Sequence, residues 1–208
     1  MAENEEGKVL VENSTFNKEE ALGRLMDIVK SYLDDADCER IMEAFRLADK
    51  AHAPQKRASG EPYILHPLAV ATILAHLQID ATTVIAALLH DVVEDTEYTL
   101  EQIEEMFGKD VAFLVDGVTK LNQFQYQTKE DQQLENYRKM ILAMAKDVRV
   151  VVIKLGDRLH NMRTLKHMRS DKQKRIAKET LEIFAPLAHR LGIFNIKWEL
   201  EDLSFRYL

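Results

Sequence analysis

Cysteine is nearly absent from this sequence of 208 residues. Cys38 stands alone, so neither an intramolecular disulfide nor a cysteine cluster for zinc is possible. Disulfides belong to oxidising compartments, and their absence favours a reducing setting. We therefore expect a cytoplasmic protein.

Long apolar runs are also missing. No window approaches the roughly 20 consecutive apolar residues that a membrane span needs. The first residues, MAENEEGKVLVENSTF, contain no basic region followed by an apolar stretch, which a secretory signal requires. We expect a protein that contacts no membrane and is not exported.

An excess of basic residues is the third absence, because the formal net charge is −7. Binding to a nucleic-acid backbone needs many cations on one surface, so direct nucleic-acid binding is not expected. A small anionic substrate stays possible, since local cations or a bound metal are enough to hold it.

Helical periodicity is what the chain does have, from Lys18 onward. Apolar residues recur at steps of three and four over 21–33 and 41–48. Pro67 suits the first turn of a further helix, which places His66 at its start. Thr99 with Gln102 predicts a capping box, and Gly108 predicts the end of that helix.

Two apolar segments need a choice of structure. Residues 82–95 are apolar on nearly every side and predict one central buried helix. The run VRVVVI favours a strand on propensity alone, but no partner strand is visible, so we predict one helix over 136–165. Pro186 predicts a break or kink in the helix that contains it. The expected fold is all-α, a helical bundle.

The domain organisation is expected to be simple. Residues 1–18 are polar and acid-rich and predict a flexible leader, whereas 19–208 predict a single domain. Within that domain, the polar, glutamine-rich segment 122–134 predicts a mobile loop.

The stretch LLHDVVEDT places four ionisable residues, His90, Asp91, Glu94 and Asp95, directly after an apolar run. Their burial is costly unless something compensates the charge. On a continuous helix the four form one patch.

Two further residues join this patch. Asp157 shares a polar stripe with Asn161 and Thr164, and an apolar stripe backs it on the opposite face of the helix. His66 adds a second imidazole from another helix.

Two imidazoles and two carboxylates form a mixed ligand set that suits Mn, Fe, Zn or Co better than Ca or Mg. Such a metal lowers the pKa of bound water and neutralises charge on a phosphoryl group. Glu94 and Asp95 are then placed to orient or deprotonate the nucleophile. Each piece has a simpler explanation: a core histidine, an exposed ion-pair face, or solvated acids near a helix end. Their joint occurrence along the chain favours the metal site.

Five segments together resemble a known family, the hydrolase domain of RelA/SpoT homologues, which are Rel-type enzymes of alarmone metabolism. These segments are SGEPYILHP, ALLHDVVEDT, LVDGVTKL, IKLGDRLHNMRTL and ETLEIFAPLAHRLGI. The resemblance runs from about residue 20 to the C-terminus. It implies an HD-domain helical bundle with a single Mn²⁺ site at its centre.

The resemblance also implies roles for particular residues. The family reaction removes the 3′-pyrophosphate from (p)ppGpp in the stringent response, giving GDP or GTP and pyrophosphate. By match to the family motifs, the metal ligands are His66, His90, Asp91 and Asp157, and the catalytic acids are Glu94 and Asp95. Residues that match the substrate pocket are Arg57, Ser59, Lys154, Asn161 and Thr164.

One position departs from the family pattern. Ala58 stands where the family usually has lysine, so one cation near the substrate is missing. Another HD-type phosphohydrolase, acting for instance on NADPH or a nucleoside phosphate, therefore stays open, as does a regulatory module that binds a nucleotide without turnover. The segment WELEDLSFRYL resembles the junction to the synthetase domain of bifunctional relatives. We therefore expect the N-terminal catalytic fragment of a longer enzyme, whose full-length relatives associate with the ribosome through domains absent here.

Overall fold

The computed structural model describes residues 17–122, 138 and 140–208. The leader up to residue 16 and nearly all of the segment 122–134 lie outside that range, so those two predictions stay untested. Regular structure in the described part is helical throughout, and the strand-type pairing found there is one isolated bridge between Lys56 and Pro62. The all-α prediction is confirmed.

The helices that position the site come first in the chain, followed by those that support it. They are α1 (Lys18–Val29), α2 (Asp35–Ala51), α3 (Leu65–Ala75), α4 (Ala81–Leu89), α5 (Val92–Asp95), α6 (Leu100–Phe107), α7 (Lys109–Asn122), α9 (Val148–Arg163), the short 3₁₀ helix η1 (Leu165–His167), α10 (Ser170–Glu179), the π-helical turn η2 (Thr180–Phe184), α11 (Ala185–Arg190) and α12 (Phe194–Phe205). Residues 140–146 are also helical.

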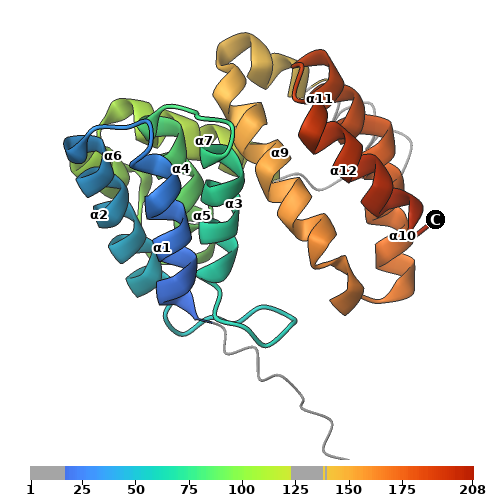
Figure 1. Ribbon diagram of the computed structural model, residues 1–208, viewed down its shortest axis with the longest axis horizontal. Coiled ribbons are helices and arrows are strands. Elements are labelled where there is room, and N and C mark those ends of the chain that lie inside the picture. The colour runs from blue at the N-terminus through green and yellow to red at the C-terminus, as the bar shows by residue number, and fades with distance from the viewer. Residues whose placement is uncertain (1–16, 123–137, 139) are drawn as a thin grey trace, which may run out of the picture.

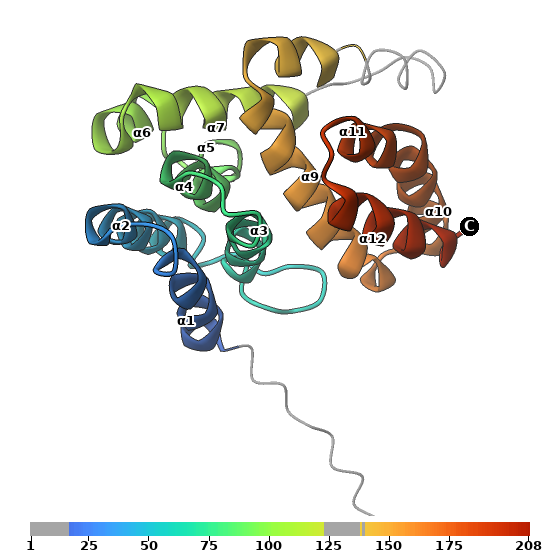
Figure 2. The same cartoon turned by 45° about the horizontal axis from the view of Figure 1, so that its top comes forward.

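Helix α9 joins two groups of helices. Figure 1 shows it running between the group formed by α1 to α7 and the group formed by α10 to α12, and Figure 2 shows the same division after rotation. Val150 and Ile153 belong to the apolar core of the first group, whereas Val151 and Leu155 belong to that of the second. This explains VRVVVI: the run is apolar on both sides because α9 is buried on both sides, and the helix prediction is confirmed.

Several helix ends follow the sequence signals. Asn17 and Asp80 each accept hydrogen bonds from backbone N–H groups of the first turn of α1 and α4. The capping box of Thr99 and Gln102 is present, and Gly108, with a φ of 90°, ends α6. The predicted irregularity at Pro186 is confirmed as well, since the π-helical turn η2 comes immediately before α11.

The prediction of one continuous helix over 82–95 is wrong. Helix α4 ends at Leu89, His90 and Asp91 form a turn, and α5 begins at Val92. His90 Nδ1 lies 2.8 Å from the carbonyl oxygen of Ala87, which in an uninterrupted helix would accept from the Asp91 N–H. The side chain thus replaces a backbone partner, and the four ionisable residues do not share one helix face.

The continuous helix predicted over 136–165 is also wrong in its described part. Asp147 interrupts it, and its side chain caps the start of α9 by accepting from the Arg149 N–H at 2.9 Å. Helix α9 then ends at Arg163, with Thr164 as its C-cap. The interruption lets α9 take its own direction between the two groups of helices.

Gly156 sets the distance between α3 and α9. A Cβ atom at this position would lie 3.2 Å from Leu74 Cδ2 and 3.4 Å from Val70 Cγ1, both side chains of α3. A close approach of these two helices is therefore built on the lack of a side chain. It matters for the site, because α3 carries His66 and α9 carries Asp157.

We expect Gly156→Leu to push α9 away from α3 and to lower the free energy of unfolding by about 1–3 kcal/mol through overpacking. Urea denaturation followed by circular dichroism measures this change. Gly23→Ala is the matched control, since a Cβ there meets nothing within 4 Å, and it is expected to stabilise α1 by up to ~1 kcal/mol. Equal stability of Gly156→Leu and the native chain would contradict the close approach.

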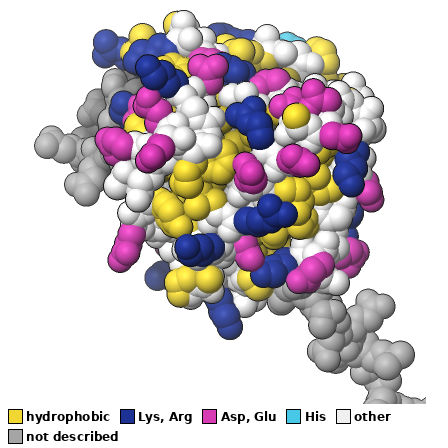
Figure 3. Space-filling model, turned by 90° about the vertical axis from the view of Figure 1, so that its left-hand side faces the viewer, with side chains coloured by type: hydrophobic (Ala, Val, Ile, Leu, Met, Phe, Trp, Pro, Cys, Tyr) yellow, Lys and Arg dark blue, Asp and Glu magenta, His cyan; other side chains and the backbone are white. Residues whose placement is uncertain are grey.

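The face of the molecule that carries α2 and α6 has charges of both signs. Figure 3 shows lysine and arginine side chains interspersed with aspartate and glutamate, with apolar side chains exposed between them. Cations on this face are not gathered into a stripe of the kind that binds a nucleic-acid backbone. Within the described residues, no helix has both the length and the apolar character needed to cross a membrane.

Candidate metal centre

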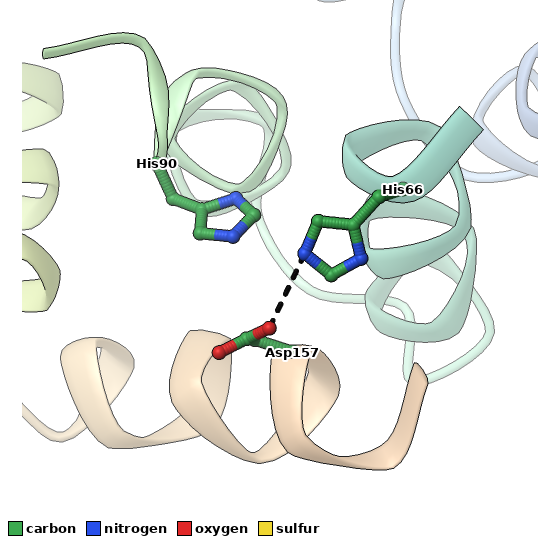
Figure 4. Close-up of side chains that lie close together, drawn as sticks. All are labelled: His66, His90 and Asp157. Carbon is green, nitrogen blue, oxygen red and sulfur yellow. Dashed lines mark ion pairs between the residues drawn. The ribbon is translucent and has the colours of Figure 1, made fainter. Parts of the chain in front are cut away.

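Three separate parts of the fold bring the predicted ligands together. His66 lies in the first turn of α3, His90 and Asp91 form the turn between α4 and α5, and Asp157 lies in the middle of α9. Figure 4 shows His66, His90 and Asp157 pointing toward one another across the space between these elements. One ligand atom from each of the three lies within 4.8 Å of the others.

Asp91 belongs to the same cluster. Its Oδ2 lies 3.2 Å from His90 Nε2 and 3.6 Å from His66 Nε2, while Asp157 Oδ1 lies 3.2 Å from His66 Nε2. All four residues are buried, with exposed fractions of 8% or less. Two imidazole nitrogens and two carboxylates thus converge on one point, which is the donor set of a divalent-metal site.

His90 shows directly that its side chain suits a cation. Its Nδ1 is held by the Ala87 carbonyl, and its Nε2 is buried and makes no hydrogen bond to the described residues. An orphaned buried nitrogen is costly, and a bound metal ion would satisfy it. The hydrogen bond at Nδ1 also favours the tautomer whose lone pair is on Nε2.

Asp157 is held ionised by its neighbours. It accepts hydrogen bonds from Lys154 Nζ and Asn161 Nδ2, both at 2.5 Å. Burial opposes the charged form, but the Lys154 ammonium and the nearby imidazoles outweigh it and hold the pKa of Asp157 well below its usual range. The carboxylate is therefore ready to bind a cation at neutral pH.

The electrostatics of His90 predict a proton release on metal binding. Burial opposes its charged form, yet the carboxylates of Asp91 and Asp157 prevail and raise the pKa of His90 to about 9 in the metal-free chain. His90 is therefore protonated at pH 7, and a metal that binds Nε2 must displace that proton.

We expect apparent metal affinity to rise as the pH is raised from 6 toward 9 and to level off above the pKa of His90. Calorimetry of Mn²⁺ binding at pH 7, in two buffers of different ionisation enthalpy, should show release of about one proton. A binding heat that is independent of the buffer would contradict this prediction.

The two predicted catalytic acids lie beside the cluster on α5. Glu94 and Asp95 are exposed, whereas the ligand Asp91 just before them is buried. Asp95 is fixed twice: its Oδ2 lies 3.0 Å from the Tyr63 hydroxyl, and its carbonyl accepts from Gln55 Nε2 at 2.7 Å. The structure therefore places a fixed carboxylate at the rim of the buried cluster.

Tyr63 links this acid to the metal cluster, and sequence reasoning missed it. Its hydroxyl also lies 2.8 Å from Asp91 Oδ2, so one side chain contacts both carboxylates. Burial and the two carboxylates raise the pKa of Tyr63, which keeps the hydroxyl protonated as a donor. The spacing of three residues between Tyr63 and His66 was the available signal.

The predicted substrate-binding residues fall into different environments. Arg57 Nη2 donates to Asn161 Oδ1 at 2.7 Å, which brings these two together next to the cluster. Ser59 Oγ is buried and makes no hydrogen bond to the described residues. Lys154 donates to Asp157, whereas the Thr164 hydroxyl lies against the α9 carbonyls of His160 and Asn161.

His160 is the second residue that sequence reasoning missed. Its Nδ1 lies 2.8 Å from His66 Nδ1 and 3.1 Å from Arg57 Nη1. Burial, His66 and the Arg57 cation lower the pKa of His160 to about 3, so the ring is neutral. Its position three residues after Asp157, on the same helix face, was the available signal.

A helical fold with a histidine, a His-Asp pair and a distant aspartate gathered at its centre defines the HD-domain class. A family model described as "HD domain" matches residues 44–194, well over half of the chain, and the chain belongs to this family. Within it, the chain is homologous to the SpoT/Rel (p)ppGpp hydrolases.

Two curated relatives illustrate this homology. The bifunctional (p)ppGpp synthase/hydrolase SpoT of Escherichia coli (strain K12) is 54% identical over 184 residues, which cover 88% of this chain and 26% of that protein. A guanosine-3′,5′-bis(diphosphate) 3′-pyrophosphohydrolase of Haemophilus influenzae is 63% identical over 160 residues, covering 77% of this chain and 24% of that protein. The chain thus spans about a quarter of the length of these relatives.

A solved structure agrees with the sequence comparison. It is described as a metazoan ortholog of SpoT that hydrolyzes ppGpp and plays a role in starvation responses. The two chains superpose with a TM-score of 0.63 at 31% identity, over 80% of this chain and 94% of the other. A protein of nearly the size of the matched region therefore has the same fold by itself.

Proposed function

We propose that this chain removes the 3′-pyrophosphate of (p)ppGpp, with Mn²⁺ held by His66, His90, Asp91 and Asp157. The observation that carries the proposal is the convergence of these four buried donors around the orphaned His90 Nε2. Their mixed nitrogen and oxygen character suits Mn²⁺ better than Mg²⁺ or Ca²⁺. The names of the relatives supply the substrate class.

The proposed reaction is hydrolysis of the bond between the ribose 3′ oxygen and phosphorus. The water oxygen forms the new bond to phosphorus, the 3′ oxygen leaves as the ribose hydroxyl, and pyrophosphate departs with GDP or GTP as the other product. When bound, the metal lowers the pKa of water and neutralises phosphoryl charge. Asp95, fixed by Tyr63 and Gln55, and the adjacent Glu94 take up the proton of the water and keep it oriented.

The substrate side of the site is proposed to lie along Arg57, Ser59 and Asn161. Arg57 is anchored by Asn161 through one edge of its guanidinium, so its planar face stays suited to stacking on a guanine base. The unsatisfied hydroxyl of Ser59 is a donor for the nucleotide. Lys154 and Thr164 complete the proposed contacts to the phosphates, although both also bond within α9. We further propose a cytoplasmic location, since Cys38, the single cysteine, is buried and reduced.

The test is an assay of the purified chain with ppGpp, with NADPH and nucleoside monophosphates as competing substrates. We expect Mn²⁺-dependent release of pyrophosphate and GDP from ppGpp, resolved by anion-exchange chromatography. Preference for NADPH or a monophosphate would replace the proposal with a different phosphohydrolase. Tight ppGpp binding by calorimetry, with no product after prolonged incubation, would replace it with a regulatory module.

A further inference from the structure

We propose that His160 is a positioning residue, which fixes the tautomer of the metal ligand His66 and ties it to Arg57. The inference rests on the metal site of the proposed function. It starts from three side chains that meet at one nitrogen: His160 Nδ1 lies 3.1 Å from Arg57 Nη1 and 2.8 Å from His66 Nδ1.

The guanidinium decides which atoms carry protons. Arginine has only N–H donors and no acceptor, so His160 Nδ1 must present its lone pair to Arg57. A neutral imidazole with a lone pair on Nδ1 carries its proton on Nε2. His66 Nδ1 faces the same lone pair and must therefore be the donor. In the neutral form of His66 the remaining lone pair then lies on Nε2, the atom that faces the carboxylates of Asp91 and Asp157.

Both ligand imidazoles are thus oriented by an acceptor at Nδ1, but by different means. His90 uses a backbone carbonyl within its own turn, which no side-chain substitution removes. His66 lies in the first turn of α3 and depends on a side chain from α9. The tautomer of His66 is therefore a tertiary property, and His160 is its source.

The same contacts link the substrate side to the metal side. Arg57 donates through Nη1 to His160 and through Nη2 to Asn161, and these neighbours bond to His66 and Asp157 respectively. One guanidinium thus braces two metal ligands that come from different helices. A displacement of Arg57 by a bound nucleotide would act on both ligands through these bonds.

The experiment compares two replacements of His160. His160→Phe keeps the ring but removes the acceptor, whereas His160→Asn restores an acceptor oxygen near the position of Nδ1. We expect Phe to weaken Mn²⁺ affinity by about 10- to 100-fold and Asn to stay within a few-fold of the native value, both by calorimetry. His167→Phe is the matched control, because His167 is an exposed histidine of the same segment.

A second readout does not depend on metal or turnover. In the metal-free native chain, ¹⁵N–¹H correlation spectra of the imidazoles should show a proton on Nδ1 of His66. A bare Nδ1 there, or equal Mn²⁺ affinity of His160→Phe and the native chain, would overturn the inference. A chain that binds Mn²⁺ with the expected order of affinities but releases no pyrophosphate would remove the proposed function and leave the inference standing. A native chain that binds no divalent metal would overturn both.

Discussion

Replacement of Asp157 by alanine is expected to abolish Mn²⁺ binding and, with it, all hydrolysis of ppGpp. Asp157 is the ligand that α9 contributes, and its carboxylate also neutralises the largely buried ammonium of Lys154. The alanine variant therefore loses an anionic ligand and at the same time leaves a cation facing the site. Both changes oppose the binding of a divalent cation, and we expect a loss of at least about 100-fold in affinity.

Two further variants separate the ligand from its charge. Asp157→Asn keeps the shape and one oxygen but lacks the charge, so it should bind Mn²⁺ more weakly than the native chain and more tightly than the alanine variant. Asp116→Asn is the matched control, since Asp116 pairs with the exposed Lys120 on α7, away from the cluster. Calorimetry with Mn²⁺ measures all three, and circular dichroism checks the fold. Native affinity in Asp157→Ala would show that the cluster is not the metal site.

Replacement of Glu94 by glutamine is expected to remove turnover and leave the metal bound. The acid is exposed beside the cluster and supplies none of its four donors. Loss of a general base costs typically 10²- to 10⁴-fold in rate, so kcat should fall by about that factor while Mn²⁺ affinity stays near the native value. Asp95→Asn should act in the same direction, because it keeps the contact with Tyr63 but accepts no proton.

Glu97→Gln controls for the removal of one negative charge, since Glu97 is exposed two residues beyond Asp95. It should retain native kcat and KM. Steady-state kinetics on ppGpp together with Mn²⁺ calorimetry distinguish a proton acceptor from a ligand: a ligand would lose affinity and rate together. Native turnover in both Glu94→Gln and Asp95→Asn would reduce these acids to solvated charges.

The sequence was a good guide wherever a local rule decided the structure. Periodicity located the helices, and the residues at Asn17, Thr99 and Gly108 marked ends that depend on backbone groups within one turn. It failed at His90, where a side chain took the carbonyl that the helix would have used. Periodicity contains no information about that competition, so the apolar pattern ran on through the turn.

The ligand types were legible from the sequence, because two imidazoles and two carboxylates have few explanations in an apolar setting. Their arrangement was not. His66 and Asp157 are 91 positions apart by their numbers in the chain, and they meet because α3 packs closely on α9 over the bare Gly156. No local pattern contains that distance.

By itself, the sequence determined the all-α class, most helix ends and the set of residues able to hold a cation, since each depends on neighbours within a turn or two. Only the tertiary structure decided how that set works. It placed Tyr63 between Asp91 and Asp95, and it set His160 against His66. The physical reason is that hydrogen-bond partners of buried polar groups are chosen by which helices pack together, and packing is a property of the whole fold.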